Sequence, residues 1–370
     1  MTKRLEAAKS AKSAVSRRQV VKGAGVAAFA AAFPTILTPR KAKAAIAITV
    51  RDPGGPYVEA FGEAYYKPFN EMMKGEIVVT GVAGKHEPTA QIKSMVDTGS
   101  YTWDMAHLSI SAHNLLRDAG YLLKLEIDDN PDVQEIPSEF RTPYLMGIDV
   151  YTTILAYRTD VYPKMGPEPT GGWKDLWDVS GIPGRRAIRK HAFDTIEQAL
   201  MADGVAPADV YPCDLARALK SLDKIKDHID IWWTGGAQTS QLLKTHEVDM
   251  CPTWNGRSQA AIDAGAPVSV SWNQSLWSFE GMCILRDGPN VDACRKFAAF
   301  CANAERQATH TKWLAYGPTN PGAYDHIPAE RAALLPTAPQ NISVSTPIDS
   351  VYWGKEKDNA MEQFNDWLLT

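Results

Sequence analysis

Segments that favour β-strands alternate with segments that favour α-helices along most of this 370-residue chain, and this order restricts the fold more than any other feature. Short β-branched runs occur at 45–50, 76–80 and 102–108. Each run is followed by apolar residues at helical spacing, at 58–69, 88–99 and 112–119. The alternation predicts an α/β fold in which helices cover both faces of a parallel sheet.

An extended stretch at 144–157 interrupts the alternation, and it is too long for one ordinary strand. We therefore predict that it passes between two domains, which also suits the length of the chain. Strands are expected again at 187–188 and 248–253, and a second extended stretch at 277–285. Further helices are expected at 195–202, 213–228, 238–245, 257–264, 291–303 and 355–369.

The first 44 residues have the order of an export signal. Arg17 and Arg18 precede an apolar, Ala-rich run at 23–37, and residues 39–44 add basic residues and a small-x-small cleavage pattern. The twin arginine indicates the Tat pathway, which moves folded proteins, and the run is too short for a stable membrane anchor. The alternative is a basic N-terminus without this role. We expect a mature protein that begins near Ala45 and works in the periplasm.

Charge and cysteine content exclude several classes of function. Residues 1–44 hold ten of the 39 Lys and Arg and one of the 43 Asp and Glu, so the remaining chain has a net charge of about −13. Such a chain repels phosphate backbones, and nucleic acid is not an expected partner. The five cysteines form no CxxC pair and have no His at metal-ligand spacing. We predict buried thiols, with a Cys213–Cys251 bridge as an alternative, and no metal site.

Four motifs occur in the order found in polyamine-type periplasmic solute-binding proteins of ABC transporters, which belong to bacterial extracellular solute-binding protein family 1. Residues 99–105 (GSYTWDM) resemble the "G…(F/Y)D(L/V)" strand of these proteins, and residues 151–160 (YTTILAYRTD) resemble their crossing strand. Residues 172–178 (GWKDLWD) resemble "(T/S)WxDLWD". Residues 252–257 (PTWNGR) stand where the family has "W(A/S)GD". The resemblance covers nearly the whole chain after the leader.

The resemblance implies a type II periplasmic-binding fold, in which two α/β lobes are joined by a two-strand hinge and close on a ligand. On this basis 45–150 forms lobe 1, completed by about 272–314, and 151–271 forms lobe 2. Residues 315–370 are expected to pack mainly on lobe 2. The implied protein is a monomer that binds a small molecule and delivers it to permease subunits in the inner membrane. The Tat translocase is a partner only during export.

Two positions of the family pattern bear on the ligand. The aspartate that usually holds a polyamine ammonium group is replaced by Arg257, whose guanidinium suits a carboxylate. Glu280 retains the second acidic residue of the family. One cationic end and one anionic end describe a site for a zwitterion, such as an amino acid or an ω-amino acid like γ-aminobutyrate.

Five other residues complete the predicted ligand-binding set. Trp254 and Asn255 lie at the end of a predicted strand, and Tyr316 matches an aromatic residue of the family. Ser109 and Asp52 follow predicted strands at the carboxyl edge of the sheet, where open α/β sheets bind ligands. Three of the predicted site residues have an ordinary structural alternative. Trp254 could be a core aromatic residue, and Arg257 or Glu280 could form an ion pair within the protein.

Other functions remain possible at this stage. The ligand could be a polyamine such as putrescine or spermidine, or the protein could carry iron(III) or thiamine on the same fold. A Tat-exported enzyme is the alternative of another class. It is not favoured, because the sequence contains no GxGxxG after a strand, no GxSxG, no HExxH and no CxxC. We predict that the protein is not an enzyme and needs no cofactor.

Overall fold

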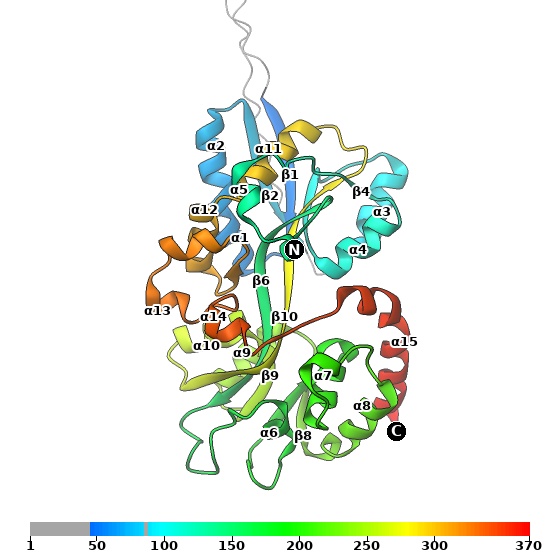
Figure 1. The fold of residues 1–370 in the computed structure, drawn as a ribbon, viewed down its shortest axis with the longest axis vertical. Coiled ribbons are helices and arrows are strands. Elements are labelled where there is room, and N and C mark those ends of the chain that lie inside the picture. Colours follow the sequence, from blue (N-terminus) through cyan, green and yellow to red (C-terminus); the bar gives the residue numbers. More distant parts are fainter. Residues whose placement is uncertain (1–44, 85–87) are drawn as a thin grey trace, which may run out of the picture. The chain divides into compact units, whose positions relative to one another are not determined.

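A computed structural model describes residues 45–84 and 88–370 (Figure 1). The predicted export signal, with Arg17 and Arg18, lies outside the described residues. Within the described part of the chain, no helix is both long enough and apolar enough to cross a membrane.

The strands form one twelve-stranded sheet whose main order is β2-β1-β3-β10-β6-β9-β7-β8. The four shortest strands pair at its margins with β6 or β10. The bounds are β1 Ile46–Asp52, β2 Ile77–Ala83, β3 Met105–Ser109, β4 Leu122–Leu123, β5 Arg141–Thr142, β6 Leu145–Arg158, β7 Arg186–Arg189, β8 Ile229–Trp233, β9 Met250–Trp254, β10 Val268–Leu285, β11 Gly317–Pro318 and β12 Thr346–Pro347.

The outer strands pair in parallel, as the alternation predicts: β1 with β2 and β3, and β7 with β8 and β9. The centre of the sheet differs. There the two longest strands, β6 and β10, run side by side and antiparallel, from Val268 opposite Arg158 to Met282 opposite Met146 (Figure 1). The extended stretches predicted at 144–157 and 277–285 lie in these two strands, and β10 begins nine residues earlier than expected.

Helices follow most of the strands. Their bounds are α1 Pro56–Phe61, α2 Lys67–Met73, α3 Thr89–Thr98, α4 Ile110–Asp118, α5 Pro131–Glu135, α6 Trp173–Trp177, α7 Ala192–Ala202, α8 Leu215–Asp223, α9 Gly236–Lys244, α10 Asn255–Asp263, α11 Val291–Cys301, α12 Ala304–Trp313, α13 Ala329–Ala332, α14 Pro339–Ile342 and α15 Ser350–Leu369. A π-helical segment, Gly62–Tyr66, joins α1 to α2, so the helix predicted at 58–69 is continuous. The helix predicted at 213–228 is shorter, because α8 ends at Asp223 and the strand β8 follows soon after.

Buried apolar side chains gather in two main cores, and β6 and β10 contribute to both. Leu145 to Val150 of β6 and Phe279 to Leu285 of β10 supply buried residues to a core with β1, β3 and α11. Leu155 and Tyr157 of β6 and Leu276 of β10 belong to a second core with α7, α8 and α15. The two central strands therefore pass from one core to the other. This division supports the lobe boundaries, which stay a prediction.

The last helix, α15, packs on the second core through Trp353, Ala360, Phe364 and Trp367. Near its start it also reaches α4, where the Asn114 side chain donates a hydrogen bond of 3.0 Å to the Ser350 hydroxyl. Residues 308–335 form a smaller apolar cluster of their own. The C-terminal segment is thus divided among several surroundings, with α15 mainly on the second core.

All five cysteines are free thiols. Cys251, Cys283, Cys294 and Cys301 are buried, which confirms the prediction of thiols in cores, and Cys213 is partly exposed. The alternative bridge between Cys213 and Cys251 is not formed. Burial raises the pKa of each of these thiols, so none of them is a reactive thiolate at neutral pH.

Candidate ligand-binding site

The described part of the chain contains a cavity of about 510 Å³, and the walls of this cavity come from segments far apart in the sequence. One wall is the turn after β1, and other walls come from the ends of β3, β7 and β9, from β6 and β10, and from α15. The lining residues are Pro53, Gly54, Gly55, Pro56, Tyr57, Ser109, Ser111, Tyr151, Arg189, His191, Phe193, Thr234, Gly235, Ala237, Trp254, Arg257, Glu280, Tyr316, Trp353 and Lys357.

Glu280 is the acidic residue of the lining. It lies on β10 opposite Ser109 of β3 and Asp149 of β6, and the register of β10 against β6 shifts between Glu280 and Gly281. Such a bulge re-aims the side chain beside it. The Tyr57 hydroxyl donates a hydrogen bond of 2.6 Å to Glu280 Oε2. A carboxylate held in this way can receive the ammonium group of a ligand.

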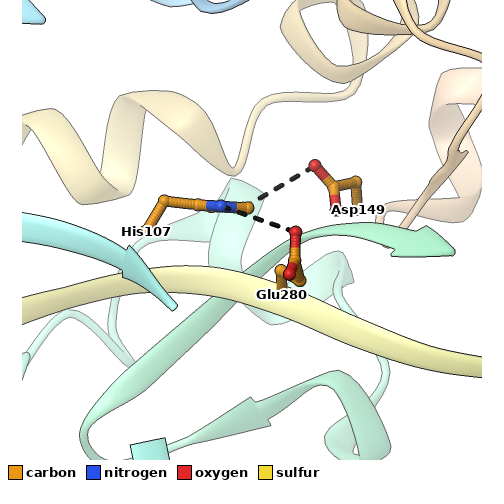
Figure 2. Close-up of side chains that lie close together, drawn as sticks. All are labelled: His107, Asp149 and Glu280. Atoms are coloured by element: carbon orange, nitrogen blue, oxygen red, sulfur yellow. Dashed lines mark ion pairs between the residues drawn. The ribbon is translucent and has the colours of Figure 1, made fainter. Parts of the chain in front are cut away.

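Behind Glu280 lies a buried group of ionisable side chains (Figure 2). His107 Nδ1 is 3.8 Å from Glu280 Oε2, and His107 Nε2 is 3.6 Å from Asp149 Oδ2. His310 Nε2 approaches the same Asp149 oxygen to 3.7 Å. These separations are too long for hydrogen bonds. His107 and Asp149 accordingly have no hydrogen-bond partner for these side-chain atoms among the described residues.

The surroundings determine the charges in this buried group. Burial and the nearby charge of Glu280 raise the pKa of Asp149 well above its ordinary value. Burial, with electrostatic repulsion by Arg51 and by the protonated form of His310, lowers the pKa of His107 well below its ordinary value, and burial lowers the pKa of His310 to about 3. Neutral imidazoles are therefore favoured at pH 7, and Asp149 holds its proton more tightly than a free carboxyl group does. Glu280 is the member of this group that lines the cavity.

The same group is where a metal ion would find ligands. The donor atoms of His107, Asp149 and Glu280 lie within 4.8 Å of one another, and no other such group occurs among the residues that the structure describes. The two closest contacts use opposite nitrogens of the His107 ring (Figure 2). In these contacts the imidazole lies between two acids, one on each nitrogen.

Arg257 and Arg189 supply positive charge on another wall. Arg257 is the third residue of α10, directly after β9, and Arg189 is the last residue of β7. The Arg189 guanidinium lies over the Trp254 ring at 5.2 Å and forms an ion pair of 3.1 Å with buried Asp194. A cation stacked on an indole in this way is attracted by its π-face. Arg189 is therefore largely neutralised, whereas Arg257 forms no ion pair within the described part of the chain.

Gly236 permits the close packing of this wall. A Cβ atom at Gly236 would lie 2.6 Å from the Trp254 ring and 3.0 Å from Arg257 Nε. Any larger residue there would displace both side chains. The absence of a side chain on α9 thus lets Trp254 and Arg257 lie against the helix backbone.

Tyr316 lies between the two charged ends. Its ring is 6.0 Å from the ring of Tyr57 and 6.1 Å from that of Tyr151. Burial is the main reason that the pKa of Tyr316 is raised. The charge of Arg257 opposes this increase, and the charge of Glu280 adds to it. Both opposite charges therefore act on the same buried phenol, and the cavity offers a cation and an anion separated by aromatic surface.

The structure brings five predicted residues together around the cavity: Ser109, Trp254, Arg257, Glu280 and Tyr316. It places Asp52 and Asn255 outside the lining. Asp52 is buried, and its carboxylate accepts hydrogen bonds from Gly54 N and the Tyr66 hydroxyl. The Asn255 side chain accepts a bond from Thr152 N and donates one to Ala315 O. Both side chains are occupied in shaping the walls, so neither enters our proposal as a ligand contact.

The sequence analysis did not select several lining residues. Arg189 follows a strand as Ser109 does, and the positional argument for strand ends could have found it. The same positional argument extends to His191 and Phe193, which follow the end of β7. Trp353 and Lys357 had no detectable signal, because they reach the cavity from the C-terminal helix α15.

Residues 64–337 match the family model of the bacterial extracellular solute-binding proteins. The chain belongs to this family. It is therefore a binding protein and not an enzyme: it captures a small ligand and works with the membrane permeases of an ABC importer. This confirms the family and the fold class expected from the four sequence motifs.

Individual relatives agree with this assignment. The chain is 32% identical over 328 residues to the gamma-aminobutyric acid-binding protein of Pseudomonas aeruginosa, covering 86% of this chain and 90% of that protein. An ABC transporter substrate-binding protein of Bradyrhizobium japonicum is 34% identical with a TM-score of 0.81, covering 87% of this chain and 99% of that one. A GABA receptor of known structure is 30% identical to this chain with a TM-score of 0.78, and the match covers 87% of this chain and 97% of that one.

Proposed function

We propose that the protein is the periplasmic solute-binding component of an ABC importer for a small zwitterion, an amino acid or ω-amino acid such as γ-aminobutyrate. One observation carries this proposal: Arg257 and Glu280 line the same cavity and both act on Tyr316. In this proposal Arg257 receives the carboxylate and Glu280 receives the ammonium group. Trp254 and Tyr316 pack against the carbon chain, and Ser109 adds a hydroxyl beside Glu280. The names of the two γ-aminobutyrate-binding relatives support the same class of ligand.

A polyamine is less suitable for this cavity. It would bring an ammonium group against each wall, and one wall carries Arg257 with Arg189 nearby. Like charges brought together in a desolvated site cost several kcal/mol. An iron(III) carrier would need several oxygen ligands around one open position, whereas Glu280 is the single carboxylate among the described residues that line this cavity.

Calorimetric titration tests the proposal with γ-aminobutyrate, a set of amino acids, putrescine and spermidine. We expect a zwitterion to bind tightly and Arg257→Gln to weaken it more than a hundredfold, because breaking a buried charge pair typically costs about 3–5 kcal/mol. Arg217→Gln is the matched control, since Arg217 forms an exposed ion pair with Asp203 far from the lining. Tight binding of putrescine that Arg257→Gln leaves unchanged would contradict the proposal. Metal analysis of the purified protein tests the iron alternative.

Export through the Tat pathway, a periplasmic location and a monomeric state are part of the same proposal. Replacing Arg17 and Arg18 with lysine should leave the precursor in the cytoplasm. Normal recovery of the mature protein from the periplasm would exclude the twin-arginine assignment. Size-exclusion chromatography with light scattering measures the oligomeric state.

A further inference from the structure

We propose that the cavity contains a second anion-binding subsite, formed by His191 and Lys357 beside Arg189, and that the ligand is a zwitterion with an additional carboxylate. This inference rests on the proposed function, because it assumes that Arg257 and Glu280 bind the first carboxylate and the amine. It identifies the ligand class as amino dicarboxylates with a net charge of −1.

The tautomer of His191 makes its ring a hydrogen-bond donor toward the cavity. His191 is the N-cap of α7, and its Nδ1 accepts a hydrogen bond of 3.0 Å from Phe193 N. The proton of the neutral ring therefore lies on Nε2, for which the described residues supply no acceptor. Burial lowers the pKa of His191 to about 3, so the ring is neutral at pH 7. A neutral N–H donor suits an anion without adding a charge of its own.

Two cations flank this donor. Arg189 and Lys357 line the same cavity as His191, and after burial their charges are the further causes of the lowered His191 pKa. Arg189 is two residues before His191 and lies over Trp254, the last residue of β9, which directly precedes the helix α10 that carries Arg257. The second subsite is thus on the carboxylate side of the cavity and away from Glu280.

The helix α15 supplies Lys357 from a fixed position. Trp353 and Lys357 are four residues apart and therefore face the same way on α15, and both line the cavity. Trp353 is buried, its indole N–H donates a hydrogen bond to Glu197, and its ring lies 5.1 Å from that of Phe193. This anchor keeps the following helical turn at the cavity. Lys357 forms no ion pair within the described residues.

The charges of the lining favour a ligand with a net charge of −1. Asp194 neutralises Arg189, which leaves Arg257, Lys357 and Glu280 with a sum of one positive charge. Lys357 is exposed at the edge of the cavity, so with a simple ω-amino acid, which is neutral overall, its ammonium group would contact solvent and not the ligand. A second carboxylate at His191 and Lys357 balances the site.

The cavity also has room for the larger ligand. γ-Aminobutyrate, with roughly seven non-hydrogen atoms, would fill on the order of 200 Å³ if each atom took a water's share of liquid volume. The cavity measures about 510 Å³. A further carboxylate and the waters that accompany it can therefore be accommodated.

Calorimetry with positional isomers tests the subsite. The probes are γ-aminobutyrate and the three compounds that carry one more carboxylate on each of its carbons: L-glutamate, 2-(aminomethyl)succinate and 2-(2-aminoethyl)malonate. We expect one of the last two, whose extra carboxylate is away from the amine, to bind at least tenfold more tightly than γ-aminobutyrate. Lys357→Met should reduce the ratio of the two affinities about tenfold. Lys355→Met, an exposed lysine of the same helix outside the lining, is the matched control.

The outcomes separate this inference from the proposed function. If γ-aminobutyrate binds and needs Arg257, but no isomer binds more tightly, the second subsite is wrong and the proposed function stands. A tighter isomer whose advantage survives Lys357→Met also overturns the subsite. If no zwitterion binds at all, the proposed function itself has failed.

Discussion

Arg189 Nη1 lies 3.1 Å from Asp194 Oδ1, and Asp194 adopts a left-handed backbone with φ of 62°. The carboxylate also accepts a hydrogen bond of 2.9 Å from the Thr153 hydroxyl on β6. Burial raises the pKa of Asp194, while Arg189 and Thr153 oppose this effect. The pair joins the end of β7 to the central strand and holds the cation over Trp254.

Removal of the Asp194 side chain should therefore be costly. Asp194→Ala leaves Arg189 without its acid and places alanine in a left-handed conformation, so we expect a loss of about 3–5 kcal/mol in unfolding free energy. Asp194→Asn keeps the shape and tolerates this φ, and should cost less. Urea unfolding measures both. Asp118→Ala, which removes an exposed pair with Arg117, should change stability by less than about 1 kcal/mol. Equal effects of the two alanine variants would contradict this account.

The hydrogen bond from Tyr57 to Glu280 should contribute to ligand affinity. Tyr57→Phe removes the donor that holds Glu280 Oε2 at 2.6 Å, while the ring still packs against Tyr316. Because a hydrogen bond to a charged group is worth about 1.5–3 kcal/mol, we expect a loss of affinity of about tenfold or more by calorimetry. Tyr121→Phe is the control, since its hydroxyl bonds to Asp97 on the surface. An unchanged Kd would show that Tyr57 does not orient Glu280.

Glu197 should make stability depend on pH. Burial raises its pKa from 4.5 to about 7, and its Oε2 has no partner among the described residues, as expected if that oxygen carries a proton. Between pH 4.5 and about 7 the folded protein holds a proton that the unfolded chain releases. The unfolding free energy should therefore fall as pH rises through this window, by about 3 kcal/mol from this group.

The measurement is the difference between the parent protein and Glu197→Gln, unfolded in urea at several pH values. Histidines such as His191 and His310, with pKa lowered to about 3, give a slope of opposite sign in both proteins. They cancel in the difference. Glu356→Gln, an acid in α15 outside the core, should leave the slope unchanged. Parallel curves for the parent and Glu197→Gln would exclude a protonated Glu197.

Gly281 should be irreplaceable at the bulge beside Glu280. A Cβ atom there would collide with the Met146 carbonyl oxygen and lie 2.7 Å from Leu145 Cδ2, and a backbone carbonyl cannot move aside cheaply. We expect Gly281→Ala to cost at least about 1–3 kcal/mol in thermal unfolding and to weaken ligand binding. Gly354→Ala is the contrasting control. Its Cβ meets open space in α15, so it should stabilise the protein by about 0.5–1 kcal/mol.

The sequence predicted those parts of the fold that local patterns determine. The strands β1, β2 and β3 and the helices between them follow the hydrophobic period, and the length of 144–157 indicated a strand shared by two cores. The helix α12 was missed because its sequence, AERQATHTKW, has few apolar residues to set a period. The strand β8 was missed, and the helix predicted at 213–228 extended up to the residue before it.

The site was predictable where one residue departs from a motif, as at Arg257. The site was not predictable where tertiary packing determines which side chains reach the cavity. Asp52 satisfies the positional rule for a ligand contact, yet its carboxylate is used by Gly54 and Tyr66. Lys357 and His191 line the same cavity only because α15 packs with α7, from which it is separated by more than 150 residues of sequence. Such contacts leave no local pattern.

Two of the eleven tryptophans, Trp254 and Trp353, line the cavity from separate segments. Indole emission changes with the polarity and charge around the ring, and an arriving ligand would change both beside these two residues. The unlabelled protein thus carries its own optical reporter of occupancy. Because Trp254 directly precedes the helix of Arg257 and Trp353 is one helical turn from Lys357, replacing each indole with phenylalanine would show which of the two cations a given molecule approaches.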